Sequence, residues 1–451
     1  MAKLRIYQGH VQNLAEGVSK LRIYQSHIQL LWKDEAYWGC EFTAVSGIET
    51  DLTVLSPAGR TLIIFAAFCP QIEVKESLEW FTDIIKPTDG VGSEQRISIR
   101  PIPRQSFTLS IPLTVAKEQS RFEAIMFGWQ KLTWGLPIWT EKVSHAATIT
   151  AGAMSITVDT TNADFRDDSY AVIWKSLTEY EMVMIDTVTD ALLTLKTAVE
   201  DTFTGDKFIM PCRICQITEA VKRNNEEVDF SIAQITFAVK DNVLLTGYVA
   251  DQSYLGLPII ITGSVIGIQN KEYTSDSDSV LQDYDTGDFD YFSDSEFNLI
   301  GQNWTFYNDT RAKCWDFRLF LHSLKGRQGS CWIPTYRNDL VQVGTIGASD
   351  TDFSIENIQL ANNMTFNSLR THLAFIFPDG TIIPKAITAI IESDSEEELI
   401  SINTALGLEV EVGDCIISFL DLSRQASDVV NIDWLEHNRN SVNQVFTAIV
   451  E

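Results

Sequence analysis

Two stretches about 200 residues apart decide the fold: LLTLKTAVEDTFTGDKFIM at 192–210 and LISINTALGLEVEVGDCII at 399–417. They share apolar, Thr and Ala positions and a closing Gly-Asp turn, with one residue of slippage before the turn. The matched residues are Leu192 and Leu399, Thr197 and Thr404, Ala198 and Ala405, and Gly205-Asp206 and Gly413-Asp414. A period of this length is too long for a solenoid and indicates a duplicated domain.

Two blocks upstream repeat in the same order. AVIW from Ala171 matches AFIF from Ala374, and the apolar-polar run 122–137 matches 317–334, ending in Trp, Pro and an aromatic residue. Three similar blocks in one order favour duplication over chance similarity.

Each copy begins with an expected helix. The helices lie in RFEAIMFGWQKL from Arg121 and CWDFRLFLHSLKGR from Cys314. In the second, one apolar stripe has helical spacing and comprises Phe317, Phe320, Leu321 and Leu324. Extended segments follow, LPIW from Leu136 and CWIPTY from Cys331, because Pro ends a helix and the residue before it prefers extended geometry.

Short alternating strands come next, separated by turns rich in Asn, Asp and Gly. In the first copy they are ITV from Ile156, YAVIW from Tyr170, MVMIDTV from Met182, LLTLKT from Leu192 and FIM from Phe208. In the second copy, FPDGTIIP from Phe377 carries an Asp-Gly hairpin turn. The pattern predicts a mainly all-β fold with a few short helices, built as two tandem duplicated modules, each with an inserted small β-barrel or sandwich.

The repeat divides the chain into seven expected segments. They are an amino-terminal segment (1–70), a first β domain with its helix (71–144), a first small β domain (145–218), return strands and linker (219–255), a second β domain with its helix (256–340), a second small β domain (341–422) and a return strand (423–451). The amino terminus has its own duplication, LRIYQGH from Leu4 and LRIYQSH from Leu21. These copies either pair as strands or occupy equivalent places in neighbouring subunits.

Composition narrows the class of protein. The 451 residues carry 34 Lys plus Arg against 61 Asp plus Glu, a formal net charge of −27, which argues against sequence-specific binding of nucleic acid. The 45% hydrophobic content indicates a globular chain. The apolar run Leu62–Cys69 is eight residues long, and a membrane helix needs roughly 20, so no membrane span is expected.

The amino terminus lacks a secretory pattern, so synthesis in a cytoplasm is expected. The odd number of cysteines, seven, favours reduced thiols over a disulfide framework. The single CxxC in PCRICQ (211–216) fits strand packing better than zinc, which needs four ligands.

An acidic stretch between Asp276 and Glu296 resembles a calcium loop only superficially, because Gly287 and Asp288 stand where that loop needs a ligand and a glycine. A solvated hairpin whose charges protect an exposed strand edge is the favoured interpretation, with a calcium site as the alternative. No metal or other cofactor is expected.

Catalytic motifs are absent from the sequence. The six histidines occur singly, without HExxH, and no Ser occupies a GxSxG elbow. The glycine-rich GVGSEQR from Gly90 falls between an expected short helix and a strand, the reverse of a phosphate-binding loop. The chain is therefore expected not to be an enzyme.

Basic residues cluster locally beside aromatic ones. Arg96, Arg100 and Arg104 lie in the first copy, and Lys325, Arg327 and Arg337 lie near Trp332 and Tyr336 in the second. Arg and aromatic residues are enriched in interface cores, which suggests self-assembly. The alternative is that these side chains cover strand faces within one domain.

Four stretches carry a family resemblance: FLHSLKGRQGSCWIPTYRNDL (320–340), YLGLPI from Tyr254, ESLEWFTD from Glu76 and SEQRISIRPIPRQSF from Ser93. Together they resemble tail-tip or baseplate structural proteins of long-tailed, siphovirus-type bacteriophages, in which a helix followed by a GRxGxFWLP-like strand belongs to a β-rich domain akin to the distal tail protein. Cys331 stands where an aromatic residue is more usual.

The resemblance implies a non-enzymatic virion protein located at the tail tip and assembled in the host cytoplasm. Its partners would be further copies of itself in a ring of three or six chains, the tail tube protein, and baseplate hub and tail fibre proteins. A closed ring needs a different patch on each side of the subunit. The alternatives are a receptor- or glycan-binding tail component and a hydrolase of cell-wall or capsule polymers.

A set of aromatic, Pro and Arg residues is expected to form an interface or a structural seam. The set is Phe317, Arg327, Trp332, Pro334, Tyr336, Arg337, Trp134, Pro137, Trp139, Arg96, Arg100 and Arg104.

Overall fold

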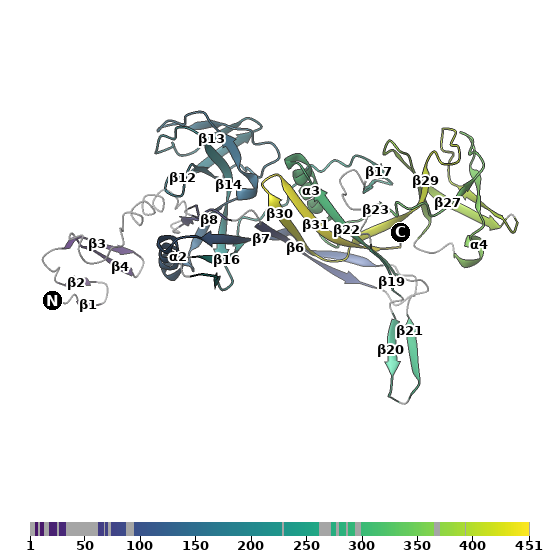
Figure 1. The fold of residues 1–451 in the computed structure, drawn as a ribbon, viewed down its shortest axis with the longest axis horizontal. Helices are drawn as coiled ribbons and strands as arrows, with labels where there is room; N and C mark the ends of the chain where they lie inside the picture. Colours follow the sequence, from purple (N-terminus) through teal and green to yellow (C-terminus); the bar gives the residue numbers. More distant parts are fainter. Residues whose placement is uncertain are drawn as a thin grey trace. The chain divides into compact units, whose positions relative to one another are not determined.

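Figure 1 shows a computed structural model of the chain. It describes residues 5–7, 10–12, 18–24, 27–32, 62–66, 68–70, 74–86, 94–227, 230–260, 272–276, 279–285, 287–293, 299–364, 370–392 and 394–450. The chain forms two compact units, Met1–Thr61 and Leu62–Glu451.

The first unit contains two antiparallel hairpins. Strand β1 (Arg5–Tyr7) pairs with β2 (His10–Gln12), and β3 (Val18–Tyr24) pairs with β4 (His27–Trp32). The described residues of the two LRIYQ copies, Arg5–Tyr7 and 21–24, thus lie in the first strand of each pair.

The second unit is divided here into a first half (62–240) and a second half (252–450). The first half contains one α-helix, one 3₁₀ turn at Trp139–Glu141 and twelve strands among its described residues. They are β5 (Leu62–Ile64), β6 (Val74–Ile85), β7 (Gln95–Leu113), α2 (Ala116–Trp129), β8 (Thr133–Pro137), β9 (Val143–His145), β10 (Ser155–Thr157), β11 (Tyr170–Trp174), β12 (Tyr180–Thr189), β13 (Leu192–Leu195), β14 (Lys207–Ile217), β15 (Lys222–Asn225) and β16 (Ser231–Val239).

The second half has the same kind of content, with a second long helix and a short one. Its described elements are β17 (Ser253–Tyr254), β18 (Leu257–Pro258), β19 (Glu272–Asp276), β20 (Ser279–Asp283), β21 (Phe289–Ser293), β22 (Leu299–Asn308), α3 (Arg311–Leu324), β23 (Cys331–Pro334), β24 (Gln342–Val343), β25 (Asp352–Glu356), α4 (Leu360–Asn363), β26 (His372–Ile376), β27 (Ile382–Glu392), β28 (Glu397–Ile402), β29 (Ile416–Gln425), β30 (Val429–Glu436) and β31 (Arg439–Ala448). The expected mainly β fold with few helices is confirmed.

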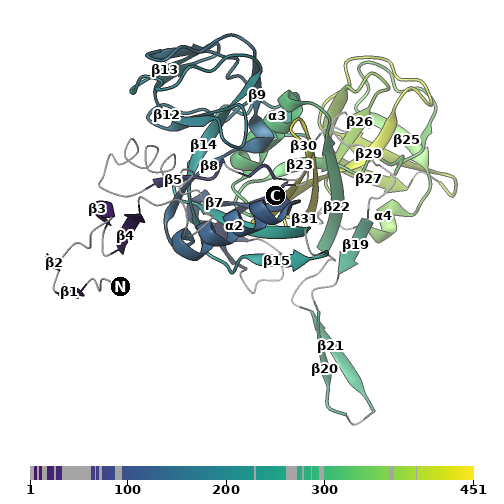
Figure 2. The same ribbon diagram turned by 60° about the vertical axis from the view of Figure 1, so that its left-hand side comes forward.

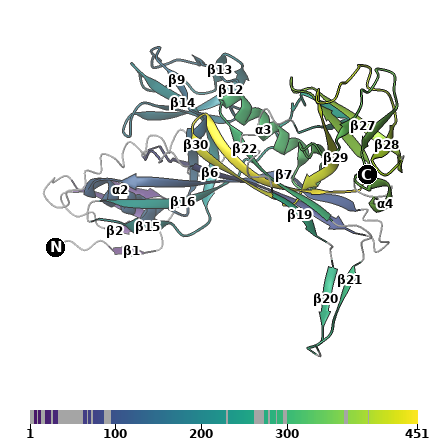
Figure 3. The same cartoon turned by 45° about the vertical axis from the view of Figure 1, so that its right-hand side comes forward.

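One antiparallel series of strands runs through both halves. Its order is β15-β16-β7-β6-β30-β31-β22-β19. The first four strands belong to the first half and the last four to the second, so the β6–β30 pair joins them. Figure 3 shows β6, β7 and β30 running across this joint.

Each half also carries a small β domain with its own apolar core. In the first half β11 pairs with β12 and β14, and β13 pairs with β10 and β12. In the second half β26 pairs with β27 and β29, and β28 pairs with β25 and β27. Figure 2 shows the two small domains as separate groups of strands, one with the labels β12, β13 and β14 and the other with β25, β26, β27 and β29.

The two small domains share details of their strand pairing. Register shifts occur at equivalent places, after Ile185 in β12 and after Ile387 in β27. An isolated bridge joins Ile149 to Phe203 in the first domain and Ile346 to Val410 in the second.

One sequence-based expectation needs correction. The helix expected before Gly90 is wrong: Val74–Ile85 is strand β6, in which residues 74, 76, 78 and 80 are buried at the two-residue period of a strand. The match of the Ala171 block with the Ala374 block stays a prediction, and both blocks contribute buried residues to an apolar core. Gly90 lies outside the described residues.

Candidate functional site

The expected seam residues around α3 and β23 lie inside the second half. Phe317 is buried on α3 and its ring centroid lies 4.7 Å from that of Phe306. Trp332 is 1% exposed, and its Nε1 donates a 2.9 Å hydrogen bond to the carbonyl oxygen of Tyr254. Pro334 is buried at the end of β23. These residues stabilise the second half from within.

Tyr336 and Arg337 follow β23 at the edge of that core. Tyr336 has a left-handed backbone (φ 52°) and its hydroxyl donates to the carbonyl oxygen of Ile260. The Arg337 guanidinium lies over the ring of Tyr273 on β19, 4.4 Å from its centroid.

The first-half members occupy comparable positions. Trp134 on β8 is 1% exposed and packs edge-on against Phe65 at 5.6 Å. Pro137 is buried at the end of β8, and Trp139 packs edge-on against Trp174 at 5.3 Å.

Two of the expected Arg residues lie where the halves meet. Arg96 on β7 donates to the Ser330 hydroxyl at 2.9 Å. Arg327 forms a 3.1 Å ion pair with Asp428 and donates to the carbonyl oxygen of Thr82 on β6 at 2.5 Å. Asp428 also accepts from the Thr82 amide at 2.8 Å. These contacts hold the β6–β7 hairpin of the first half against the second half.

The other two Arg residues stay within the first half. Arg100 donates to the carbonyl oxygens of Glu79 and Trp80, both at 3.0 Å. Arg104 is exposed on β7, opposite Glu79. Whether any of the twelve residues contacts another protein stays a prediction.

A buried cluster of charged residues at the joint between the halves is not among the twelve expected seam residues. Arg318 on α3 is buried and forms ion pairs of 2.7 Å with Glu76 on β6 and 2.5 Å with Glu141 after β8. Glu76 also accepts hydrogen bonds from Gln105 at 2.7 Å and from the Trp434 indole at 2.9 Å. Burial disfavours the Arg318 charge, but the two carboxylates outweigh it and raise its pKa.

A second buried ion pair continues from this cluster. Glu141 accepts from the Asp164 amide at 2.6 Å, and the Asp164 carboxylate pairs with Arg213 at 2.6 Å and Arg166 at 2.5 Å. Burial disfavours ionisation of Asp164, yet the two guanidinium groups outweigh it and lower its pKa. Every one of these carboxylates is already neutralised by a cation, which suits a structural role better than acid-base chemistry.

The sequence contained a signal for this network. Arg318 lies on the same helical face as Cys314 and Leu321, and Glu76 occupies an inward position of β6 between Val74 and Leu78. Charged residues at positions that the apolar period places inside are rarely buried unless they are paired. The distance of 242 residues between the two partners hid the pairing.

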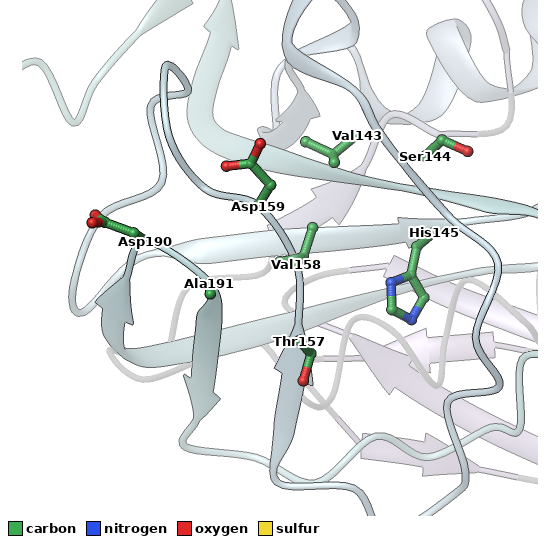
Figure 4. A pocket seen from close by; sticks show the side chains of 8 residues that line it. All are labelled: Val143, Ser144, His145, Thr157, Val158, Asp159, Asp190 and Ala191. Carbon is green, nitrogen blue, oxygen red and sulfur yellow. The ribbon is translucent and has the colours of Figure 1, made fainter.

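A hollow of about 420 Å³ lies on the surface of the first small domain (Figure 4). Asp159 and Asp190 lie apart from the His145 ring there, and Ser144 points away from it (Figure 4). Asp159 accepts from the amide of Thr161 at 3.0 Å and from its hydroxyl, and these bonds lower its pKa. These groups do not converge as a nucleophile, base and acid would need to.

A cavity of about 10 Å³ lies beside Arg318 and His322. That volume holds at most one water molecule, so this cavity is far too small for a substrate.

The two cysteines of the CxxC motif are packed inside a strand, and the acidic stretch forms a hairpin. Cys212 and Cys215 are buried in β14, where burial raises the pKa of both thiols. The acidic stretch forms the β20–β21 hairpin, confirming a hairpin there. Within the described residues no group of three His, Cys, Asp or Glu is placed to hold a metal ion, and no helix is long and apolar enough to cross a membrane.

No family model matches the chain, and no curated protein matches it.

Proposed function

We propose that the chain is a non-enzymatic structural protein of a bacteriophage tail tip, where it forms a ring that joins the tail tube to hub and fibre proteins. One observation carries the proposal: the second half continues the sheet of the first through the pairing of β6 with β30. A unit that adds to itself in this way is suited to building a ring.

The proposal includes a gene duplication as the origin of the two halves. Three pairs of backbone hydrogen bonds support it, because each pair joins residues at similar places in the two halves. Phe65 N donates to Gly135 O at 2.8 Å, and Ile260 N donates to Trp332 O at 2.9 Å. Ile138 N donates to Pro211 O at 2.8 Å, and Thr335 N donates to Phe419 O at 2.9 Å. Lys240 N donates to Ile214 O at 2.7 Å, and Ile449 N donates to Leu422 O at 2.8 Å.

The non-enzymatic role is supported by the state of the buried charges. Glu76, Glu141 and Asp164 are each bound by a guanidinium group, and the cavity beside them is smaller than any substrate. The virion location rests on the sequence resemblance alone.

Electron microscopy tests the proposal directly. Purified protein is expected to form closed rings, and antibody against the chain is expected to label the tail tip of virions. Particles labelled elsewhere, or unlabelled particles that contain no such chain, would reject the assignment.

The competing function is binding of a receptor or glycan. The β20–β21 hairpin favours it specifically, because Tyr284, Phe289 and Tyr291 are exposed there and aromatic rings stack on sugars. Trp332, by contrast, is buried and offers no such surface. Binding of the isolated chain to host cells, lost on replacing the three hairpin residues by Ser, would favour this function over the ring.

A further inference from the structure

The joint between the halves shows how one module of this protein attaches to the next. Strand β30 lies antiparallel to β6, with Val430 opposite Leu78 and Ile432 opposite Glu76, and all four residues are buried. On the outer face Asp433 forms an exposed 3.9 Å ion pair with Lys75.

Each partner in this joint has a counterpart at an end of the strand series. By position in the series, β15 corresponds to β30 and β19 corresponds to β6. In the described part of the chain, β15 pairs with β16 and β19 pairs with β22, and neither pairs with a further strand. Among the described strands, the series therefore has β15, the counterpart of β30, at one edge and β19, the counterpart of β6, at the other.

We propose that β19 of one copy pairs with β15 of the next copy, in the register of the internal joint, and that this contact closes the ring. This inference rests on the proposed ring function and names its contact. Transferring the register places Val221 opposite Ser275, Lys222 opposite Thr274, and Arg223 opposite Tyr273.

One charged residue on each edge complements the other. Lys222 lies on β15 in a chain whose net charge is −27, and Glu272 lies on β19, whereas the neighbouring Arg223 is already paired with Glu123 of its own copy. The register places exposed Lys222 diagonally from exposed Glu272, within reach of a cross-strand ion pair. If β15 of one copy paired with β15 of another, Lys222 would face other positive charges. The charges therefore favour head-to-tail pairing of β15 with β19.

The helices give independent support. Seven residues of α3 are buried but only two of α2. His322 on α3 is 4% exposed because the first half covers it, with the Trp80 ring edge-on at 5.6 Å. The equivalent α2 residue, Phe127, is 97% exposed. A Phe so fully exposed, at the position covered in the other half, marks the surface that the next copy would cover.

The two hairpins that project from the sheets fit the same arrangement. The β6–β7 hairpin of the first half is held against the second half by Arg96 and Arg327. The β20–β21 hairpin (Figure 1) occupies the matching place in the chain order. It carries the exposed residues Leu281, Phe289 and Phe292. In the proposed ring this hairpin would lie on the first half of the neighbouring copy.

Cysteine cross-linking tests the contact. In a chain with Cys40 and Cys69 changed to Ser, Lys222→Cys and Thr274→Cys are made separately, oxidised alone and oxidised as a mixture. We expect a covalent dimer only in the mixture, because directly opposite Cβ atoms lie about 5 Å apart. The matched control mixes Asn224→Cys with Thr274→Cys, a diagonal pair at roughly 7–8 Å, and is expected to cross-link much less.

A second measurement does not depend on disulfide geometry. Phe127→Glu is expected to weaken self-association by roughly tenfold or more, while Val412→Glu, an exposed apolar residue of the second small domain, leaves it unchanged. Sedimentation measures association, and thermal unfolding of the dissociated chain checks that both variants fold.

The outcomes separate this contact from the ring itself. Closed rings without the cross-link, and with Phe127→Glu assembling normally, would overturn the β15–β19 contact and leave the ring function standing. A chain that is monomeric both in solution and in virions would overturn both. Cross-linking in the mixture together with loss of assembly in Phe127→Glu supports the contact.

Discussion

The guanidinium of Arg318 lies 2.7 Å from the carboxylate of Glu76, although 242 residues separate them in the chain. Arg318 belongs to the helix of the second half and Glu76 to the β6 strand that the second half extends. The ion pair therefore lies at the joint, and its removal reports on how firmly the halves are held together.

Replacing Arg318 by Met is expected to destabilise the protein by roughly 3–5 kcal/mol, because it leaves buried carboxylates without a cation. The triple variant Arg318→Met, Glu76→Gln, Glu141→Gln is expected to lose less. Urea unfolding measures both. Lys313→Met is the control: it removes a residue of the same helix that forms an exposed 2.8 Å ion pair with Asp309, which precedes the helix, and it should cost at most about 1 kcal/mol. Equal losses for Arg318→Met and Lys313→Met would contradict the structural role.

Gly326 ends the α3 region with φ +68°, and a Cβ there would lie 2.5 Å from Asp428 Oδ1 and 3.0 Å from Trp80 Cβ. We expect Gly326→Ala to cost roughly 2 kcal/mol or more through backbone strain and this crowding. Gly380→Ala has a similar φ of +89° and open space around it, so it should cost about 1 kcal/mol. Thermal unfolding compares the two, and an equal cost would show that crowding at the joint is unimportant.

Trp332→Ala is expected to destabilise the protein by roughly 3–5 kcal/mol and to impair tail assembly, since it empties the core beside Tyr254. Tyr336→Phe loses only the hydroxyl that donates to Ile260 and should cost about 1 kcal/mol. Chemical unfolding and the yield of infectious particles measure the effects. Virions at normal yield with Trp332→Ala would argue strongly against this placement.

Asp421 has its pKa raised to about 6 by burial, against an ordinary 3.8, despite the 3.0 Å hydrogen bond from Gln302 and Arg370 nearby. The folded state thus holds a proton that the unfolded state releases between pH 4 and 6. Stability should fall as pH rises through this window, by roughly 3 kcal/mol from this group. The free energy of unfolding of Asp421→Asn minus that of the wild type should be larger at pH 7 than at pH 4. A difference independent of pH would refute this.

His322 shows the opposite dependence. Burial, then the neighbouring Arg318 charge, lower its pKa to about 3, and its Nδ1 accepts from the Leu245 amide at 3.2 Å. The unfolded state takes up a proton near pH 6.5 and the folded state does not, so stability falls on acidification. Between pH 7 and 4 the group should cost roughly 3 kcal/mol. The stability gap between wild type and His322→Gln should narrow or reverse at pH 4. A constant gap would show that the histidine is protonated in the folded state.

The local patterns of the sequence predicted much of the fold. The Phe317, Phe320, Leu321 and Leu324 stripe forms the buried face of α3, and YAVIW from Tyr170 is strand β11 residue for residue. These succeed because helix and strand periods are set by residues a few positions apart. The short-helix expectation for the segment before Gly90 failed, since β6 is fixed by pairing with β7 and the distant β30.

The sequence by itself determined the mainly β content, the helix faces and the order of similar blocks, because these follow from neighbouring side chains and their burial. Only the tertiary structure decided that Glu76 meets Arg318, that β30 extends the sheet of β6, and that Phe127 is exposed where His322 is covered. Such contacts join residues that lie far apart in the sequence, and the local apolar pattern of one sequence does not identify the distant partner.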